Sequence, residues 1–364
     1  METPTSIEQV QDAVRRAQVV RVRGGGSKPA LSADATLDLS GLRGVVDYDP
    51  SELTLVALAG TRVAEIQQLL GEHGQYLPFD PPLAGSGATL GGTVASGLSG
   101  PGRFRYGGLR DFVLGVRLVN GQGSLIRGGG KVVKSVAGFE LAKLMVGSLG
   151  RYGVLVEVAF KVFPGPEATA TLRVDCDNLA TALDAMISLA AAPLDLMCLE
   201  LEPPRRLWVR IGGRSESLRQ RAERVGRLAR RSGKVDEASG PEEAEWWQAY
   251  GEFAWVPEAY GLVKIPIGSR QIPRLESCIA RWEPQPVRRY GIAGNVVWLA
   301  WPPELAPSRL EDALAALGRR ALALRGRWPR RMLGPAPKDV FSARLLQVFD
   351  PAGRFRRSAG ETTD

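Results

Sequence analysis

Glycine is concentrated in one part of this sequence, where eight of the 25 residues from Gly87 to Asp111 are glycine. Before Arg103 the other residues are mostly small or aliphatic. Each glycine loses more backbone freedom on folding than any other residue, so a stretch of this kind is costly unless bare backbone is needed. The segment therefore predicts a backbone that lies close to something only backbone can reach.

A second glycine-rich loop, RGGGSKP at Arg23–Pro29, directly follows a predicted strand. Its successive N–H groups and Lys28 could hold a phosphate. The loop does not satisfy the Walker pattern GxxxxGK[ST], nor does 128–133, and the strand-like TLDLS follows where a dinucleotide fingerprint needs a helix. One such loop could be a plain turn, but two in one domain favour a large anionic cofactor.

Histidine and cysteine are too scarce to suggest a metal centre. The chain has one histidine, His73, and three cysteines, Cys176, Cys198 and Cys278, with no CxxC spacing. This pattern argues against iron–sulfur, zinc and disulfide frameworks. The net charge of +8 is scattered among acidic residues rather than gathered in a nucleic-acid-binding stripe. No apolar run is long enough to cross a bilayer and no secretory signal is recognisable, so we expect a cytoplasmic protein.

Hydrophobic periodicity predicts an α+β protein with a boundary near 164–167. Before it we expect a helix over 6–17, short strands, a helix over 61–74 capped by Thr61, a hairpin around the NGQG turn and a strand over 152–163. After it, strands and helices alternate as in an antiparallel sheet covered by helices on one face, in two ferredoxin-like halves. The expected domains are 1–165, 166–330 and a tail, 331–364.

Several motifs occur in an order that resembles a known family. RGGGSK, PFDPP, ATLGGTVASGLSGP with YGGLRDFVLGVRLVNGQG, and VAGFELAKLMVGSLGRYGVLVEVAFKVFP are similar to the FAD domain of the vanillyl-alcohol-oxidase (PCMH-type) family. The resemblance covers roughly 1–165 and is strongest to the FAD-binding E subunits of bacterial glycolate oxidases. It implies a PCMH-type FAD-binding domain of two α/β subdomains, followed by a smaller antiparallel domain.

The resemblance also implies which residues contact FAD. Proline and glycine positions in four segments match the family pattern, and the N–H groups of the second loop are expected to hold the phosphates and the polar edge of the flavin. A larger residue at Gly91 should block the cofactor. The matched residues are Gly24, Gly25, Gly26, Ser27 and Lys28 in the first loop, Pro81 and Pro82 on the isoalloxazine side, Ala88, Thr89, Gly91, Gly92, Ala95, Ser96 and Gly97 in the second loop, and Gly107, Gly153 and Val154 towards the ribityl and adenine end.

Three departures from the family pattern shape the functional expectation. Relatives that attach FAD covalently do so through a histidine in the first loop or a cysteine elsewhere, whereas this loop carries Ser27 and Lys28, so we expect non-covalent FAD. Hydroxy-acid-oxidising relatives have several histidines around the flavin, but none follows His73, which favours a surface or capping role for it. The ending DPAGRFR also differs from the family's, which leaves open how the tail packs.

The first functional hypothesis is an FAD-binding subunit of a glycolate (2-hydroxy-acid) oxidase or dehydrogenase complex. The resemblance implies two partners: a D-type flavoprotein subunit with the catalytic residues and an F-type iron–sulfur subunit that takes the electrons. No nucleic acid or metal is expected, and the complex could lie on the inner face of the plasma membrane. No catalytic residue is assigned to this chain.

Two alternatives remain. The first is a stand-alone FAD-dependent alcohol or sugar oxidoreductase with Tyr290, Glu200 or Glu202 as its base; the second is a non-enzymatic scaffold subunit. The aromatic segment WWQAYGEFAW at 246–255 could be core, a subunit interface or a substrate wall, with Trp247, Tyr250 and Ala254 expected on one face. Lys131 or Lys134 near the flavin is a minor possibility.

Overall fold

The computed structural model describes residues 1–130, 140–336 and 340–355, so Lys131 and Lys134 lie outside the described residues. The chain divides into two units. Unit 1 comprises Met1–Ser99, Gly108–Gly165 and Pro337–Asp364, and unit 2 comprises Gly100–Gly107 and Pro166–Ala336. This division differs from the predicted domains in three places, because Gly100–Gly107 and 331–336 belong to unit 2 and Pro337–Asp364 belongs to unit 1.

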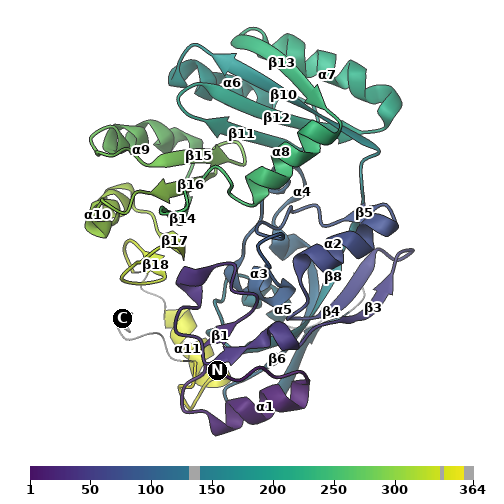
Figure 1. Ribbon diagram of the computed structural model, residues 1–364, viewed down its shortest axis with the longest axis vertical. Helices are drawn as coiled ribbons and strands as arrows, with labels where there is room; N and C mark the ends of the chain where they lie inside the picture. Colours follow the sequence, from purple (N-terminus) through teal and green to yellow (C-terminus); the bar gives the residue numbers. More distant parts are fainter. Residues whose placement is uncertain (131–139, 337–339, 356–364) are drawn as a thin grey trace. The chain divides into compact units, whose positions relative to one another are not determined.

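Unit 1 is built around a five-stranded antiparallel sheet in the order β3-β4-β8-β6-β7 (Figure 1). The strands are β3 (Val45–Asp49), β4 (Thr54–Leu58), β6 (Val113–Val119), β7 (Leu125–Gly129) and β8 (Val154–Lys161). The predicted hairpin is confirmed, since β6 and β7 pair on either side of the NGQG turn. The Asn120 side chain accepts the N–H groups of Gln122 and Ser124 and so closes this turn.

Smaller elements complete unit 1. Two short sheets pair β1 (Val22–Arg23) with β2 (Leu37–Asp38) and β5 (Gln75–Tyr76) with β9 (Phe163–Pro164). The predicted first helix is confirmed, and Ser6 caps it by accepting the N–H of Gln9. Thr61 does not cap the next helix; its hydroxyl instead contacts the backbone of Gly44. The helices are α1 (Ile7–Arg16), η1 (Pro29–Leu31), η2 (Leu39–Gly41), α2 (Val63–Glu72), α3 (Leu90–Ser96), η3 (Leu109–Asp111), α5 (Leu141–Met145) and α11 (Val340–Phe349).

The C-terminal segment completes the core of unit 1. After α11, the Asp350 carboxylate accepts the N–H groups of Arg354 and Phe355, each at 2.8 Å. The Arg354 carbonyl in turn accepts the N–H of Val20 at 2.7 Å, and buried Phe355 packs in the core cluster that contains Val20. In Figure 1, α11 is drawn in yellow and the N-terminal strand β1 in purple, at the two ends of the colour scale. Residues 350–355 therefore fold back onto the N-terminal part of unit 1.

Unit 2 contains one nine-stranded antiparallel sheet in the order β13-β10-β12-β11-β15-β16-β14-β17-β18 (Figure 1). Each half follows a βαββαβ path, and the halves meet where Leu201 of β11 pairs with Tyr290 of β15. The predicted α+β class and ferredoxin-like halves are confirmed. The strands are β10 (Ala168–Cys176), β11 (Cys198–Glu202), β12 (Arg206–Gly213), β13 (Gly233–Ser239), β14 (Gly261–Pro266), β15 (Val287–Gly291), β16 (Val296–Trp301), β17 (Ala321–Arg325) and β18 (Met332–Leu333).

Helices lie on both faces of this sheet, so the prediction of a single covered face is wrong. Four helices share one large core with inward side chains such as Leu199, whereas α8 packs Trp247 and Tyr250 against the neighbouring Cys198 on the opposite face. The large core is formed by α6 (Leu179–Ala191), α7 (Ser215–Ala229), α9 (Ile272–Ile279) and α10 (Pro307–Leu317); the remaining helices of unit 2 are α4 (Arg103–Tyr106), α8 (Pro241–Gly251) and η4 (Ser269–Gln271).

Among the described residues, no helix combines the length and the apolar character that a membrane span requires.

Candidate functional site

A pocket in unit 1 brings the two glycine-rich loops together. Its wall includes nine of the seventeen predicted contact residues, together with five residues that the sequence did not single out. The predicted residues in the wall are Gly24, Gly25, Gly26, Ser27, Lys28, Thr89, Gly92, Ala95 and Ser96; the additional ones are Val22, Arg23, Leu31, Ser32 and Leu149.

The first loop presents a row of unused backbone donors to this pocket. In the described part of the chain, none of the N–H groups from Gly24 to Lys28 has a hydrogen-bond acceptor. Gly26 adopts φ +74°, a left-handed conformation that favours glycine. Successive free N–H groups in a turn can form an anion-binding concavity. The loop therefore suits a phosphate group.

The first two glycines of this loop are required by contact between the loops. A Cβ at Gly24 would lie 2.1 Å from the Thr89 hydroxyl, and a Cβ at Gly25 would lie 1.7 Å from the Gly87 carbonyl oxygen. Backbone at these positions must therefore be bare for the two loops to close on each other. Part of the glycine excess in the sequence is explained by this approach of one loop to the other.

The second loop uses most of its N–H groups internally. Those of Ala88 and Gly91 donate to the carbonyls of Leu83 and Ala59, and that of Gly92 contacts the Thr89 hydroxyl at 3.3 Å. These three N–H groups thus have acceptors within the protein, and their contact with the phosphates of a cofactor stays a prediction. The α3 residues that line the pocket are glycine, alanine and serine. Their small side chains leave room for a ligand close to the helix backbone.

Gly91 is constrained by Ala59 rather than by the pocket. A Cβ at Gly91 would meet the Ala59 side chain at 2.7 Å, and Gly91 is not among the lining residues. The expectation that a larger residue there directly blocks a cofactor is thus corrected, since the clash lies within the protein. Gly97 likewise ends α3 in a left-handed conformation and donates to Thr93 and Val94.

Lys28 is the most unusual side chain in the pocket wall. It is 8% exposed, and its ammonium contacts the Ser27 hydroxyl at 3.0 Å. Desolvation by burial lowers the pKa of Lys28 to about 8. Arg23, by contrast, is neutralised, because its guanidinium contacts the buried Asp38 carboxylate at 2.6 Å. Arg23 precedes the glycines directly, and this position is the signal that could have drawn attention to it.

The other predicted contact residues do not line this pocket. Pro81 and Pro82 are buried in a turn of unit 1. Gly153 approaches Leu118 and Val119, and buried Val154 pairs with Val119 in the core. Gly107 lies in unit 2, where it ends α4. Contact between these residues and a cofactor stays a prediction.

Leu149 lies in a turn and lines the pocket, although the sequence did not predict that this turn contributes to the pocket wall. It has φ +54°, and its N–H donates to the Ala95 carbonyl of α3 at 2.8 Å. The GSLG motif around it was the available signal, because paired glycines commonly mark such turns.

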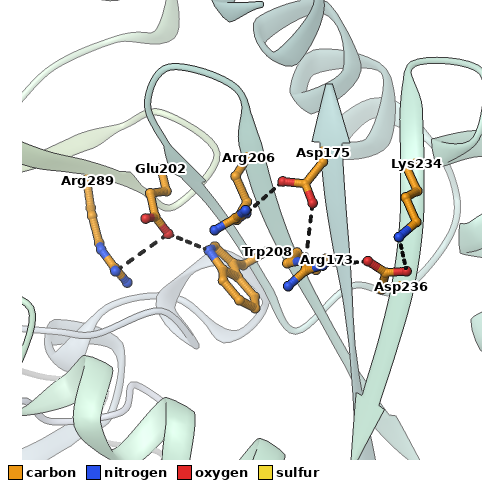
Figure 2. Close-up of polar contacts among 8 residues, drawn as sticks. All are labelled: Arg173, Asp175, Glu202, Arg206, Trp208, Lys234, Asp236 and Arg289. Atoms are coloured by element: carbon orange, nitrogen blue, oxygen red, sulfur yellow. Dashed lines mark hydrogen bonds and ion pairs between the residues drawn. The ribbon is translucent and has the colours of Figure 1, made fainter. Parts of the chain in front are cut away.

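The three candidate bases of the alternative hypothesis are held by internal partners. The Tyr290 hydroxyl donates to Glu276, and the Glu200 carboxylate accepts the Tyr250 hydroxyl and the N–H of Ile292. Glu202 accepts the indole N–H of Trp208 at 3.0 Å and pairs with Arg289 at 3.5 Å (Figure 2). Tyr290 and Glu200 are also almost completely buried.

The sheet face that carries Glu202 also has a chain of ion pairs. Figure 2 shows Asp175 between Arg206 and Arg173, and Asp236 between Arg173 and Lys234. Every carboxylate drawn there has a cationic partner. These groups form a polar sheet surface rather than an acid–base pair.

Histidine and the aromatic segment are structural within the described residues. His73 is exposed at the end of α2 and its ring lies 5.3 Å from that of Tyr48. Trp247 and Tyr250 are core residues, whereas Ala254 is exposed, contrary to the expectation that the three share a face. The described residues contain no group of three or more potential metal ligands.

Comparison with protein families indicates which kind of ligand the pocket suits. The profile of a family described as "FAD binding domain" matches residues 2–129, a range that contains every lining residue except Leu149. This part of the chain is thus similar to a family of FAD-binding domains. The pocket fits such a cofactor on structural grounds as well, since unused N–H groups and a buried ammonium suit a diphosphate.

Relatives of this FAD-binding chain include subunits of oxidase complexes. It is 40% identical over 223 residues to the glycolate oxidase subunit GlcE of Escherichia coli, covering 60% of this chain and 63% of that one. It is 32% identical over 164 residues to the glycolate oxidase subunit GlcD of Bacillus subtilis, covering 45% and 35%. The chain thus spans less than two thirds of the length of either relative.

The fold of the FAD-binding chain recurs in solved structures. An alkyldihydroxyacetonephosphate synthase superposes with a TM-score of 0.73 at 16% identity, covering 98% of this chain and 76% of the synthase. At this identity the likeness concerns the fold alone.

Proposed function

We propose that this chain holds FAD non-covalently and serves as the FAD-binding subunit of a glycolate (2-hydroxy-acid) oxidase or dehydrogenase complex. The observation that carries the proposal is the first loop, where the N–H groups from Gly24 to Lys28 lack acceptors in the described protein. The similarity to two glycolate oxidase subunits supports the substrate class. FAD supplies the capacity to accept two electrons and pass them on.

Non-covalent attachment is supported by the composition of the pocket wall. No histidine or cysteine occurs among its lining residues. Cys176 and Cys198 are buried in unit 2, and His73 is exposed on α2. The first loop instead offers Ser27 and Lys28, which bind anions without forming a bond to a flavin.

We place the hydroxy-acid chemistry on a partner subunit. Removing a hydride and a proton from glycolate to give glyoxylate needs a base within reach of the substrate hydroxyl. Tyr290, Glu200 and Glu202 are each committed to internal partners. A D-type flavoprotein subunit would provide this base, and an F-type iron–sulfur subunit would take the electrons. The complex would be cytoplasmic, at most peripheral to the inner face of the plasma membrane.

The first test is the visible spectrum of the purified chain before and after acid precipitation. A flavin spectrum that moves to the supernatant supports non-covalent FAD. Flavin left in the pellet contradicts the proposed mode of attachment. A colourless protein that stays colourless after incubation with FAD contradicts the cofactor assignment itself and supports the scaffold alternative.

The second test compares activity of this chain alone with that of the chain co-expressed with the two proposed partners. Glycolate-dependent dye reduction should require the D-type subunit, and an iron–sulfur chain should co-purify. Turnover of glycolate by the isolated chain at the rate of the complex would show that it is a complete enzyme.

A further inference from the structure

Lys28 is a buried cation without a counter-ion in the described part of the protein. Its side chain lines the FAD pocket, and its one hydrogen-bond partner there is the uncharged Ser27 hydroxyl. Burying an ammonium without an anion is unfavourable, and a protein normally avoids it or lowers the charge by losing a proton. The apo pocket therefore retains an unfavourable charge that a bound anion would relieve.

Among the described residues of the pocket wall, no other group can take over this role. The one other ionisable lining residue among them is Arg23, whose guanidinium is already neutralised by Asp38. The lining residues from η1, from α3 and from the turn at Leu149 carry no ionisable side chain. Lys28 is therefore the group whose charge can change when an anion enters.

We propose that FAD binding at this pocket is coupled to protonation of Lys28, so that at alkaline pH the chain takes up one proton with the cofactor and releases it when the cofactor leaves. This inference rests on the proposed function. The anion that stabilises the protonated Lys28 is the diphosphate, because it is the charged part of FAD and the neighbouring N–H groups of the first loop can donate hydrogen bonds to it.

The direction of the pH dependence follows from the change in pKa. The pKa of Lys28 is about 8 without an anion, and a nearby diphosphate stabilises the ammonium and raises it. More than about one pH unit below this pKa the lysine is protonated in both states, so binding moves no proton. Above pH 8 the apo lysine is neutral and the bound lysine is charged, so affinity falls by up to about tenfold per pH unit.

The experiment is titration of FAD into the chain by calorimetry, at pH 6.5 and pH 9, in two buffers of different ionisation enthalpy. We expect no proton uptake at pH 6.5 and close to one proton at pH 9, with weaker binding at the higher pH. Riboflavin, which lacks the diphosphate, should bind without taking up a proton at either pH. Proton uptake with riboflavin equal to that with FAD would overturn the assignment to the diphosphate.

Two variants separate the charge of Lys28 from its packing. Lys28→Arg keeps a charge that does not titrate, so FAD should bind at both pH values with no proton uptake. Lys28→Met removes the charge, so FAD affinity should fall at pH 6.5 while the melting temperature of the apo chain rises. A lysine with only a packing role would not produce opposite effects. Lys234→Met, at an exposed lysine of unit 2, is the matched control and should change neither quantity.

The titration distinguishes an incorrect role for Lys28 from an incorrect assignment of the cofactor. FAD that binds with the same affinity and no proton uptake at both pH values would refute the role of Lys28 and leave an FAD-binding chain. Absence of FAD binding at any pH would refute the proposed function, and this inference with it.

Discussion

Arg210 of β12 donates two hydrogen bonds to the Glu243 carboxylate of α8, from Nε at 2.7 Å and from Nη2 at 3.1 Å. The same carboxylate accepts the hydroxyls of Thr169 and Thr171, each at 2.8 Å. With 2% of Glu243 exposed, this is a buried pair whose lone pairs are satisfied by four donors. It fastens α8 to the sheet face opposite the large core of unit 2.

Replacing Glu243 should therefore destabilise unit 2 strongly. Glu243→Ala removes the carboxylate that accepts two hydrogen bonds from the largely buried Arg210 guanidinium, and breaking such a pair costs about 3–5 kcal/mol in the free energy of unfolding. Urea unfolding followed by tryptophan fluorescence measures this loss. The neighbouring Glu242 is exposed, so Glu242→Ala should change stability by less than about 0.5 kcal/mol. Equal effects of the two variants would contradict a specific clamp.

Gly25→Ala should weaken FAD binding by holding the two glycine loops apart. Its Cβ would lie 1.7 Å from the Gly87 carbonyl oxygen, so one loop must move. Overpacking of this kind costs about 1–3 kcal/mol, which corresponds to roughly tenfold to hundredfold in affinity if the strain falls on the pocket. Fluorescence titration with FAD measures the change.

The matched control for Gly25→Ala is another glycine that has free space. Gly71 lies in α2 with nothing within 4 Å of its Cβ position. Gly71→Ala should leave FAD affinity unchanged and stabilise the protein by up to about 1 kcal/mol, because alanine favours helix. Unchanged FAD affinity in Gly25→Ala would show that the loops can separate without affecting the pocket.

Asp350→Ala should release the C-terminal turn from unit 1. The N–H groups of Arg354 and Phe355 would lose their acceptor, at a cost of about 1–3 kcal/mol. We expect trypsin to cut after Arg354 much faster than in the unaltered protein, which mass spectrometry can follow. Gln347→Ala, at an exposed position of α11, should leave the cleavage rate unchanged. Similar cleavage of both variants would contradict the anchoring role of Asp350.

Alkaline titration should leave Tyr250 and Tyr290 protonated until the protein unfolds. Burial, and then the neighbouring carboxylates Glu200 and Glu276, raise the pKa values of Tyr250 and Tyr290. A raised pKa in the folded state stabilises the fold fully below the unfolded value near 10, and this contribution falls by about 1.4 kcal/mol per pH unit per group above it.

Absorbance of the phenolate near 295 nm measures this titration. Two phenols should ionise only together with the loss of tertiary structure, and Tyr290→Phe should reduce that late fraction to one. Reversible ionisation of all seven tyrosines in the folded protein would contradict the burial of these two hydroxyls.

Features specified by local sequence could be predicted. The NGQG turn defined the hairpin of β6 and β7, and the order of strands and helices after 166 gave the two ferredoxin-like halves. The first glycine loop was recognised because its glycines, Ser27 and Lys28 are contiguous in the chain. In each case the residues that determine the structure are close together in the sequence.

Features that depend on distant partners could not be predicted. The N–H group of Gly91 donates to the Ala59 carbonyl, which lies in another part of the sequence. Position 25 must be glycine because a Cβ there would clash with the Gly87 carbonyl oxygen. Nothing in the pattern of α8 tells that Trp247 and Tyr250 cover the second face of the sheet. The unbalanced charge of Lys28 is likewise visible only once every neighbour of its side chain is known.

The return of the C-terminal segment to unit 1 has a consequence for the order of synthesis. When the ribosome has completed Gly165, the FAD-binding unit still lacks Phe355 and the Asp350 turn that holds it against Val20. Unit 2 is contiguous after Pro166 except for Gly100–Gly107, so all of it emerges before the first unit can close its core. A fragment that stops at the boundary between the units would omit part of the interior of the unit it was meant to isolate.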